Sequence, residues 1–159
     1  MAMLLVDSRE KWTQSDDAKP GRSVRNYFRK HKIEYTVQKL EVGDYMYPDG
    51  KVSVDRKQSL QELATNLMNR SDSARFWREV RRAREIGIKL IVLIEQGGNY
   101  HSIRDVAGWK SQYSPVTGRK LMVEMTRLEM GYGVRFVFCD KRSSGRRILE
   151  LLEDSKNDI

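Results

Sequence analysis

The sequence contains very little cysteine, histidine or proline, and two of these shortages exclude a class of site. Its 159 residues include one cysteine, two histidines and three prolines. A single thiol, Cys139, gives neither a disulfide framework nor a cysteine-based zinc site. His31 and His101 are too few for a histidine-based nuclease motif or a histidine-rich metal site. We therefore expect Cys139 to fill the core and both histidines to lie at the surface of an intracellular protein.

The chain also lacks long apolar runs and glycine-rich nucleotide-binding loops. The N-terminal segment MAMLLVDSRE reaches a charge after only a handful of apolar residues, and KLIVLIE at 89–95 is too short to cross a bilayer. GGNYHS at 97–102 lacks the Lys-Ser/Thr ending of a P-loop. These features predict a soluble protein with no signal peptide, no membrane association and no nucleotide cofactor.

Length and charge indicate one basic domain. A domain of this size can bury roughly 70% of the surface that its unfolded chain exposes. No repeat, low-complexity tract or Pro-rich linker marks a boundary, so we predict a single domain over residues 1–159. Lys and Arg number 30 against 22 Asp and Glu, which gives a net charge of +8. Because basic surfaces attract phosphate through counterion release, this excess favours a polyanionic partner.

The hydrophobic pattern predicts alternating strands and helices. Apolar residues alternate or run continuously in the expected strands and recur at helical spacing in the expected helices. We expect strands at 3–7, 33–47, 51–57, 89–95 and 133–139, with 89–95 central and covered on both sides. We expect helices after residue 23, from residue 59 to 83 with an interruption at 69–73, at 120–131 and at 143–155, and a short one near 103–110.

The turn signal Pro-Asp-Gly at 48–50 joins two of these segments. We expect the β-rich segments 33–47 and 51–57 to form a hairpin around it. The resulting order β, α, β, β, α, β, α, β, α predicts an α/β fold with a mixed β-sheet flanked by helices.

The predicted hairpin carries charged residues at strand positions where apolar core residues would be expected. The hairpin can bring Asp44 and Asp55 together at one sheet edge, and Lys57 shares a strand face with Asp55. Paired carboxylates bind Mg²⁺ or Mn²⁺, and a neighbouring ammonium can orient water or offset charge in a transition state. The same spacing also occurs in exposed strands that alternate Asp and Lys, and Asp44 after Gly43 could be a simple turn residue.

Asp-x-Lys downstream of an aspartate resembles the PD-(D/E)xK nuclease arrangement, and longer segments resemble the XPF-type nuclease (ERCC4 domain) family. The C-terminal stretch 134–154 also resembles that family's closing elements, so the resemblance covers nearly the whole chain. It implies a restriction-endonuclease-like fold. The ordered segments are VDSRE at 6–10, LEVGDY at 40–45, VDRKQSLQEL at 54–63, ARFWREV at 74–80 and LIVLIE at 90–95.

The resemblance implies a metal site for Mg²⁺ or Mn²⁺ in this chain. Asp44 and Asp55 would be metal ligands, the backbone carbonyl of Arg56 a further candidate ligand, and Lys57 the catalytic lysine. Where the family usually has Glu this chain has Asp55, which is shorter by one methylene. Since Asp is also accepted in the wider superfamily, this change tunes the metal geometry without excluding activity.

Further residues would surround that site. By resemblance, Asp7 and Arg9 lie beside the metal, with Asp7 a ligand directly or through water. Arg56 and Arg75 would touch phosphate or brace the carboxylates. Glu95, at the end of its strand, would be a further member of the site.

Basic clusters suggest a surface for DNA. Arg75, Arg78 and Arg82 form one helix stripe, which is either a solvated face or a surface that follows the phosphate backbone. Arg119 and Lys120 stand at another helix start, where backbone amides also favour phosphate.

Two further loop features leave their roles open. KRSSGRR at 141–147 is a basic cluster that also opens a helix. Trp109 and Tyr113, in a glycine-rich loop, would either stack on an unpaired base or pack.

The resemblance implies a metal-dependent endonuclease acting on flap, fork or otherwise branched DNA in repair or recombination. The chain shows no helix-hairpin-helix module and no helicase domain, so this domain or a partner would select the substrate. Two alternatives remain, a dimeric Holliday-junction resolvase-like nuclease and a non-catalytic DNA-binding partner subunit. Retention of Asp44, Asp55 and Lys57 argues against the second. The expected location is the cytoplasm or nucleoid, or the nucleus of a eukaryote.

Overall fold

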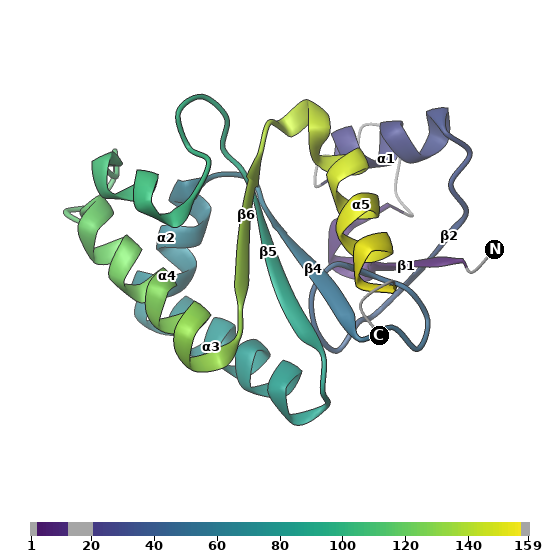
Figure 1. Cartoon of the computed structure of the whole chain (residues 1–159), viewed down its shortest axis with the longest axis horizontal. Coiled ribbons are helices and arrows are strands. Elements are labelled where there is room, and N and C mark those ends of the chain that lie inside the picture. Colours follow the sequence, from purple (N-terminus) through teal and green to yellow (C-terminus); the bar gives the residue numbers. More distant parts are fainter. Residues whose placement is uncertain (1–2, 13–20, 157–159) are drawn as a thin grey trace.

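The computed structural model describes residues 3–12 and 21–156, in which one six-stranded sheet carries helices on both faces (Figure 1). The strand order is β2-β1-β3-β4-β5-β6. The strands are β1 (Leu4–Asp7), β2 (Tyr35–Gln38), β3 (Tyr45–Met46), β4 (Val52–Lys57), β5 (Lys89–Glu95) and β6 (Arg135–Cys139).

Five α-helices and three short 3-10 segments connect these strands in the described residues. None of these helices combines the length and hydrophobicity that a bilayer-spanning segment needs. The α-helices are α1 (Arg22–Lys30), α2 (Leu60–Met68), α3 (Arg70–Glu85), α4 (Gly118–Tyr132) and α5 (Ser144–Lys156). The 3-10 segments are η1 (Ser8–Glu10), η2 (Ile103–Gly108) and η3 (Lys141–Ser143).

Only β3 runs against its neighbours in this sheet. It pairs antiparallel with β1 and β4, whereas the β1–β2, β4–β5 and β5–β6 pairs are parallel. The C-terminal ends of the other five strands therefore meet the start of β3 at one edge of the sheet. This mixed sheet flanked by helices confirms the predicted α/β fold class.

The predicted hairpin is smaller than expected, because β2 does not belong to it. β2 instead pairs with β1 at the border of the sheet, and only the two residues of β3 form the partner of β4, through Tyr45 and Val54. Gly43 interrupts the β-rich segment 33–47, since its φ of 72° takes the chain out of the extended conformation. The patterned segment therefore forms two strands in different places.

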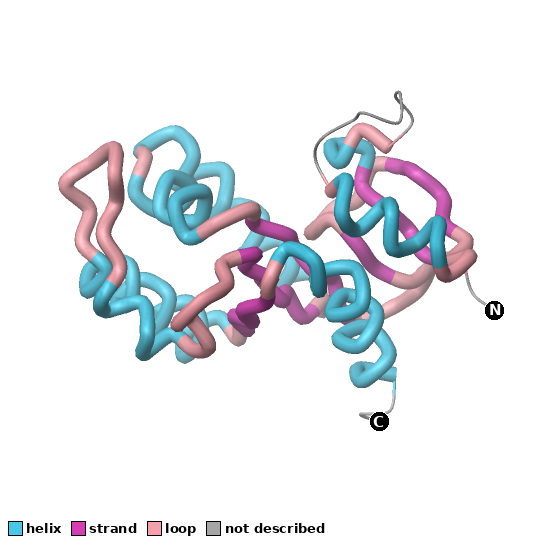
Figure 2. Tube along the Cα trace, turned by 90° about the horizontal axis from the view of Figure 1, so that it is seen from above, coloured by secondary structure: helices cyan, strands magenta, loops and turns pink. Residues whose placement is uncertain are grey.

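Strand β5 lies inside the sheet with both faces buried, as its continuous apolar run predicted. Leu90, Val92 and Ile94 join the core under α2, α3 and α4. Ile91 and Leu93 join the core under α1 and α5. Figure 2 shows the strands lying between the helices on either side. The period of two along a strand explains this division.

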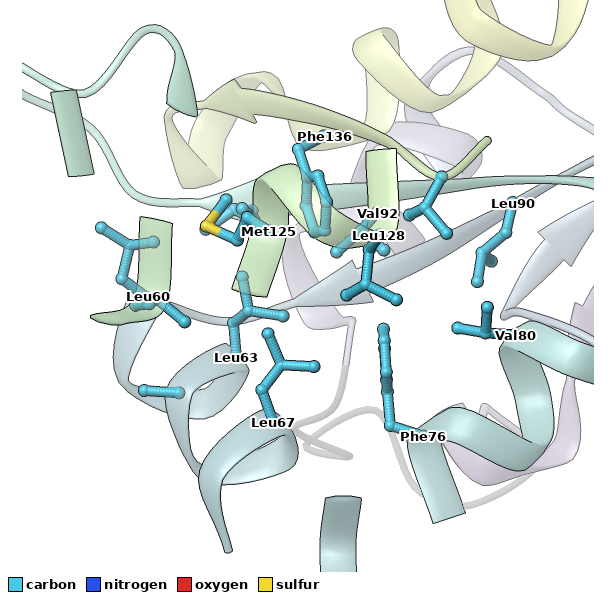
Figure 3. Close-up of a cluster of buried hydrophobic side chains, with 14 of the residues drawn as sticks. Leu60, Leu63, Leu67, Phe76, Val80, Leu90, Val92, Met125, Leu128 and Phe136 are labelled. Atoms are coloured by element: carbon cyan, nitrogen blue, oxygen red, sulfur yellow. The ribbon is translucent and has the colours of Figure 1, made fainter. Parts of the chain in front are cut away.

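The larger core contains the helical stripes that the sequence indicated. Leu60, Leu63 and Leu67 of α2 lie with Phe76 of α3 and Met125 of α4 in one cluster (Figure 3). Each of these side chains is buried. Their burial fixes the rotation of α2 and α3, and so determines which side chains of these helices reach the sheet edge where the other strands end and β3 begins.

Asn69 divides the long helical stretch into α2 and α3, at the predicted interruption. It ends α2 in an extended conformation, and its Oδ1 accepts hydrogen bonds from the backbone amides of Ser71 at 3.2 Å and Asp72 at 3.4 Å. This N-cap starts a new helix in a new direction.

Expectations for isolated residues have mixed outcomes. His31 and His101 are exposed, which confirms the prediction for both histidines. Cys139 is only partly buried against the smaller core, because it ends β6 at the edge of the sheet. Trp109 packs into the larger core, which favours the packing alternative for this residue. Tyr113 is 82% exposed, and its stacking on a base stays a prediction.

Candidate active site

A pocket of about 270 Å³, here called the carboxylate pocket, lies at the sheet edge where five strands end and β3 begins. Strand β4, the residues before β3, and helices α2 and α3 contribute its lining. The lining residues are Arg9, Glu10, Asp44, Asp55, Arg56, Lys57, Gln58, Glu62, Asn66, Asp72, Arg75, Phe76 and Glu79. A net basic protein thus gathers six carboxylates in one place, an arrangement suited to a cation.

Asp44 is fixed to β4 through both its backbone and its side chain. Its amide donates to the Val54 carbonyl at 2.8 Å, and its Oδ2 accepts a hydrogen bond from the Arg56 amide at 2.8 Å. The preceding Gly43 lies so close to β4 that a Cβ there would stand 2.1 Å from the Ser53 Oγ. Gly43 is therefore part of what positions Asp44, which is buried rather than an exposed turn residue.

Asp55 and Lys57 lie side by side, as the strand period predicted. Lys57 Nζ is 3.2 Å from Asp55 Oδ2 and 5.4 Å from the centroid of the Phe76 ring. The Lys57 ammonium is therefore the cation that faces this buried Oδ2.

The pocket holds its negative charge unevenly. Burial raises the pKa of Asp44 well above its ordinary 3.8, and the charges of Asp55 and Glu10 raise it further. Burial alone would raise the pKa of Asp55, but the Lys57 charge together with hydrogen bonds from Asp44, Lys57 and Glu79 outweighs burial and lowers this pKa. Burial would lower the pKa of Lys57, yet Asp55 and Asp44 raise it above 10.5. Asp55 is thus a carboxylate beside a permanent cation.

Glu79 of α3 is a member of the pocket that the sequence prediction missed. Its carboxyl lies within hydrogen-bonding reach of Asp55, and burial together with the charge of Asp55 raises its pKa to about 8. Glu79 comes four residues after Arg75, so the helical period that grouped the arginines could have placed it on the same face.

Arg56 carries out the bracing that was one of its two predicted roles, and its contact with phosphate stays a prediction. Its guanidinium is enclosed, and it donates to Glu10 at 2.9 and 3.1 Å and to Glu95 at 2.7 Å. Tyr45 also donates to Glu10. The side chain therefore braces carboxylates behind the pocket, and Glu95 belongs to this brace rather than to the pocket lining.

Asp7 lies next to Arg9 with both of its carboxylate oxygens in hydrogen bonds. Its Oδ1 accepts from the Leu40 amide at 2.8 Å, and its Oδ2 accepts from the Arg9 amide at 3.2 Å and from the Arg9 side chain. Asp7 does not line the pocket. Its carboxylate thus holds Arg9, which does line the pocket, and its metal binding, directly or through water, stays a prediction.

A second hollow of about 610 Å³, here called the basic groove, adjoins the pocket. Arg75, Arg78 and Arg82, the predicted stripe of α3, line it, and Arg9 and Arg75 border both hollows. Arg82 also pairs with Glu41. The other lining residues are Ser8, Lys39, Leu40, Glu41 and Glu79.

The remaining predicted DNA contacts lie elsewhere. Arg119 and Lys120 are exposed in the first turn of α4, after the Thr117 N-cap. Neither residue lines the carboxylate pocket or the basic groove. The structure thus separates them from the arginine stripe of α3.

The donor atoms of the pocket fit a hard divalent cation. Asp44 and Asp55 line the pocket and supply carboxylate oxygens, the ligands that Mg²⁺ and Mn²⁺ prefer. Within residues 3–12 and 21–156, no three His, Cys, Asp or Glu side chains form a ready metal cage. The residues therefore fit the ion as a two-carboxylate site.

Known proteins match this chain through its fold and its sequence family. No curated protein sequence matches it. XPF from Aeropyrum pernix has a TM-score of 0.66 at 19% identity, over 96% of this chain and 61% of that chain. XPF from Aeropyrum pernix in complex with DNA has a TM-score of 0.66 at 22% identity, over 99% and 66%. The chain thus spans less than two thirds of either structure. The sequence profile of the ERCC4 domain matches residues 6–152, and the chain therefore belongs to the ERCC4 domain family.

Proposed function

We propose that this chain is a metal-dependent DNA endonuclease that hydrolyses phosphodiester bonds at the carboxylate pocket. The observation that carries the proposal is the meeting of Asp44, Asp55 and Lys57 at the sheet edge of an ERCC4 domain. The likeness to XPF in complex with DNA supports DNA as the partner. Family resemblance favours flap, fork or branched DNA as substrate.

Asp44 and Asp55 would hold Mg²⁺ or Mn²⁺, with the backbone carbonyl of Arg56 as a further ligand. When bound there, such an ion polarises a phosphoryl oxygen and lowers the pKa of a bound water. The hydrogen bond from the Arg56 amide to Asp44 and the brace of Arg56 with Glu10 and Glu95 keep these oxygens in place.

Lys57 would act as a fixed positive charge. Because Asp55 and Asp44 raise its pKa, Lys57 remains an ammonium at neutral pH and cannot accept a proton from water. An ammonium held beside Asp55 and over Phe76 can instead orient the attacking water and offset charge that develops on the phosphate.

The basic groove would guide the DNA backbone to the pocket. Arg9 and Arg75 border both hollows. A DNA strand that follows Arg78 and Arg82 would therefore stay beside arginine side chains until it reaches the carboxylates. Arg119 and Lys120 would contact a more distant part of the DNA, since they lie outside the groove.

The test is cleavage of end-labelled flap, fork, four-way-junction and plain duplex DNA, with Mg²⁺, Mn²⁺ or EDTA. Metal-dependent cutting of the branched substrates above duplex supports the proposal. Tight binding without cutting in any metal would contradict it and favour the non-catalytic subunit. Symmetric cutting of the four-way junction by a species with the mass of a dimer would favour the resolvase-like nuclease.

A further inference from the structure

Glu79 presents a buried carboxylate oxygen that the proposed reaction does not yet use. Its Oε1 is enclosed and has no hydrogen-bond partner in the described residues. Its carboxyl lies within hydrogen-bonding reach of Asp55, whose own Oδ2 faces the Lys57 ammonium at 3.2 Å. The Glu79 oxygen therefore stands in the same small pocket without a donor, and burying such an atom is costly unless something pairs with it.

Helix α3 directs Glu79 to this place. Phe76 and Val80, on either side of it in sequence, are anchored in the larger core, which fixes the rotation of the helix. Asp72, Arg75 and Glu79 then share the helix face that lines the pocket, at the spacing i, i+3 and i+7. Glu79 therefore points into the pocket as a consequence of core packing.

The cationic side chains that line the pocket are fewer than its six carboxylates, since among the described residues only Arg9, Arg56, Lys57 and Arg75 belong to the lining. Lys57 is paired with Asp55, and Arg9 is paired with Asp7, which lies outside the pocket. Asp44 and Glu79 are left without a salt-bridge partner among the residues described. A cation brought from solution would supply the missing charge, and its preferred ligands are carboxylate oxygens.

We propose that Glu79 is a third carboxylate ligand of the divalent cation, together with Asp44 and Asp55. This inference rests on the proposed metal site and adds a ligand from α3 to it. Since the three carboxylates are not gathered into a ready cage, Glu79 turns from its contact with Asp55 toward the ion. The competing explanation is a structural carboxyl–carboxylate hydrogen bond between Glu79 and Asp55.

Glu79→Gln separates the two explanations. The amide of glutamine can still donate a hydrogen bond to Asp55, but it brings no negative charge to a metal. Glu85→Gln is the matched control, because Glu85 is an exposed glutamate of the same helix and does not line the pocket. Circular dichroism would verify that both variants are folded.

The readout is Mn²⁺ binding without DNA, followed by the electron paramagnetic resonance signal of the free ion. We expect Glu79→Gln to weaken binding roughly 10- to 100-fold while Glu85→Gln leaves it unchanged. Binding by Glu79→Gln as tight as by wild type would overturn the inference and leave the two-aspartate site intact. Absence of binding by wild type would instead contradict the proposed metal site itself, and the inference with it.

Discussion

Gly43 determines where Asp44 lies, because the backbone turn and the close approach to β4 both need a residue without a side chain. Its φ is 72°, and a Cβ there would meet Ser53 Oγ at 2.1 Å. Ser53 Oγ already donates to the Val42 carbonyl at 2.6 Å, so it cannot move away without losing that bond. The position of the Asp44 carboxylate therefore depends on Gly43, a residue without a side chain.

Gly43→Ala should lower the free energy of unfolding more than Gly87→Ala does. Gly87 has a similar φ of 74°, but a Cβ there meets nothing within 4 Å, so this control isolates the steric clash. The positive φ alone costs about 1–2 kcal/mol in both variants, and the clash adds to the cost at Gly43 only. The measurement is denaturation in urea, and equal losses in the two variants would refute the clash.

Cys139 should react slowly with thiol reagents in the folded chain. Burial raises the pKa of its thiol from 9.0 to about 12, so at pH 8 the thiolate is about a thousandfold rarer than in the unfolded chain. A thiol with a raised pKa stabilises the fold below pH 9, and this contribution is lost as the pH rises toward 12. Alkylation rates at pH 8 with and without denaturant test this, and equal rates would contradict it.

At the level of residues, the sequence predicted which side chains meet in the pocket better than it predicted which side chains brace them. Asp44, Asp55 and Lys57 could be identified because strand period and family resemblance both depend on short segments. The pairing of Arg56 with Glu10 joins residues 46 positions apart, and it forms only when η1 and β4 meet in the fold. No local pattern in either segment contains that information.

Helix α3 carries both the arginine stripe and Glu79, and the break at Asn69 sets its direction. The polar segment 69–73 indicated an interruption, since Asn and Ser bind backbone amides at helix starts. The structure adds that one residue both ends α2 and caps α3. The site thus depends on a cap that lies outside its own lining.

Asn69→Ala should lower the free energy of unfolding by about 1 kcal/mol, because two backbone amides of α3 lose their acceptor. Asn99→Ala, in an exposed loop, is the control and should change stability little. Chemical denaturation measures both. If Asn69→Ala were as stable as wild type, the cap would not hold α3.

The elements were easier to predict than their order in the sheet. The central position of β5 followed from its apolar run, because only a strand covered on both faces tolerates one. The separation of β2 from β3 did not follow, because both strands lie in one continuous β-rich segment. Only the backbone of Gly43 and the pairing of β2 with β1 place them on opposite sides of β1.

Across the whole molecule, one sheet edge collects opposite charges in neighbouring hollows. The carboxylate pocket suits a cation, and the basic groove beside it suits phosphate. This arrangement follows from topology, since five strands end where β3 begins. A net charge of +8 therefore says less about function than the separation of the charges does.

Arg78→Gln should weaken DNA binding and reduce its salt dependence. A residue that contacts phosphate contributes about one to the slope of log K against log salt, so the slope should become shallower by about that amount. Arg84→Gln is the control, because Arg84 of the same helix lies over the Tyr132 ring and outside the groove. Titrations at several salt concentrations measure the slopes. Equal slopes for both variants and wild type would show that DNA does not contact the basic groove at Arg78.

Single-turnover cleavage of the preferred DNA by wild type, Asp44→Asn, Asp55→Asn and Asp72→Asn tests the central claim most directly. Asp72 lines the same pocket and serves as the control for loss of a nearby carboxylate. We predict that Asp44→Asn and Asp55→Asn each lower the rate more than about a hundredfold in Mg²⁺, while Asp72→Asn keeps most of the wild-type rate. Cleavage at the wild-type rate by Asp44→Asn and Asp55→Asn would show that the reaction takes place somewhere other than the carboxylate pocket.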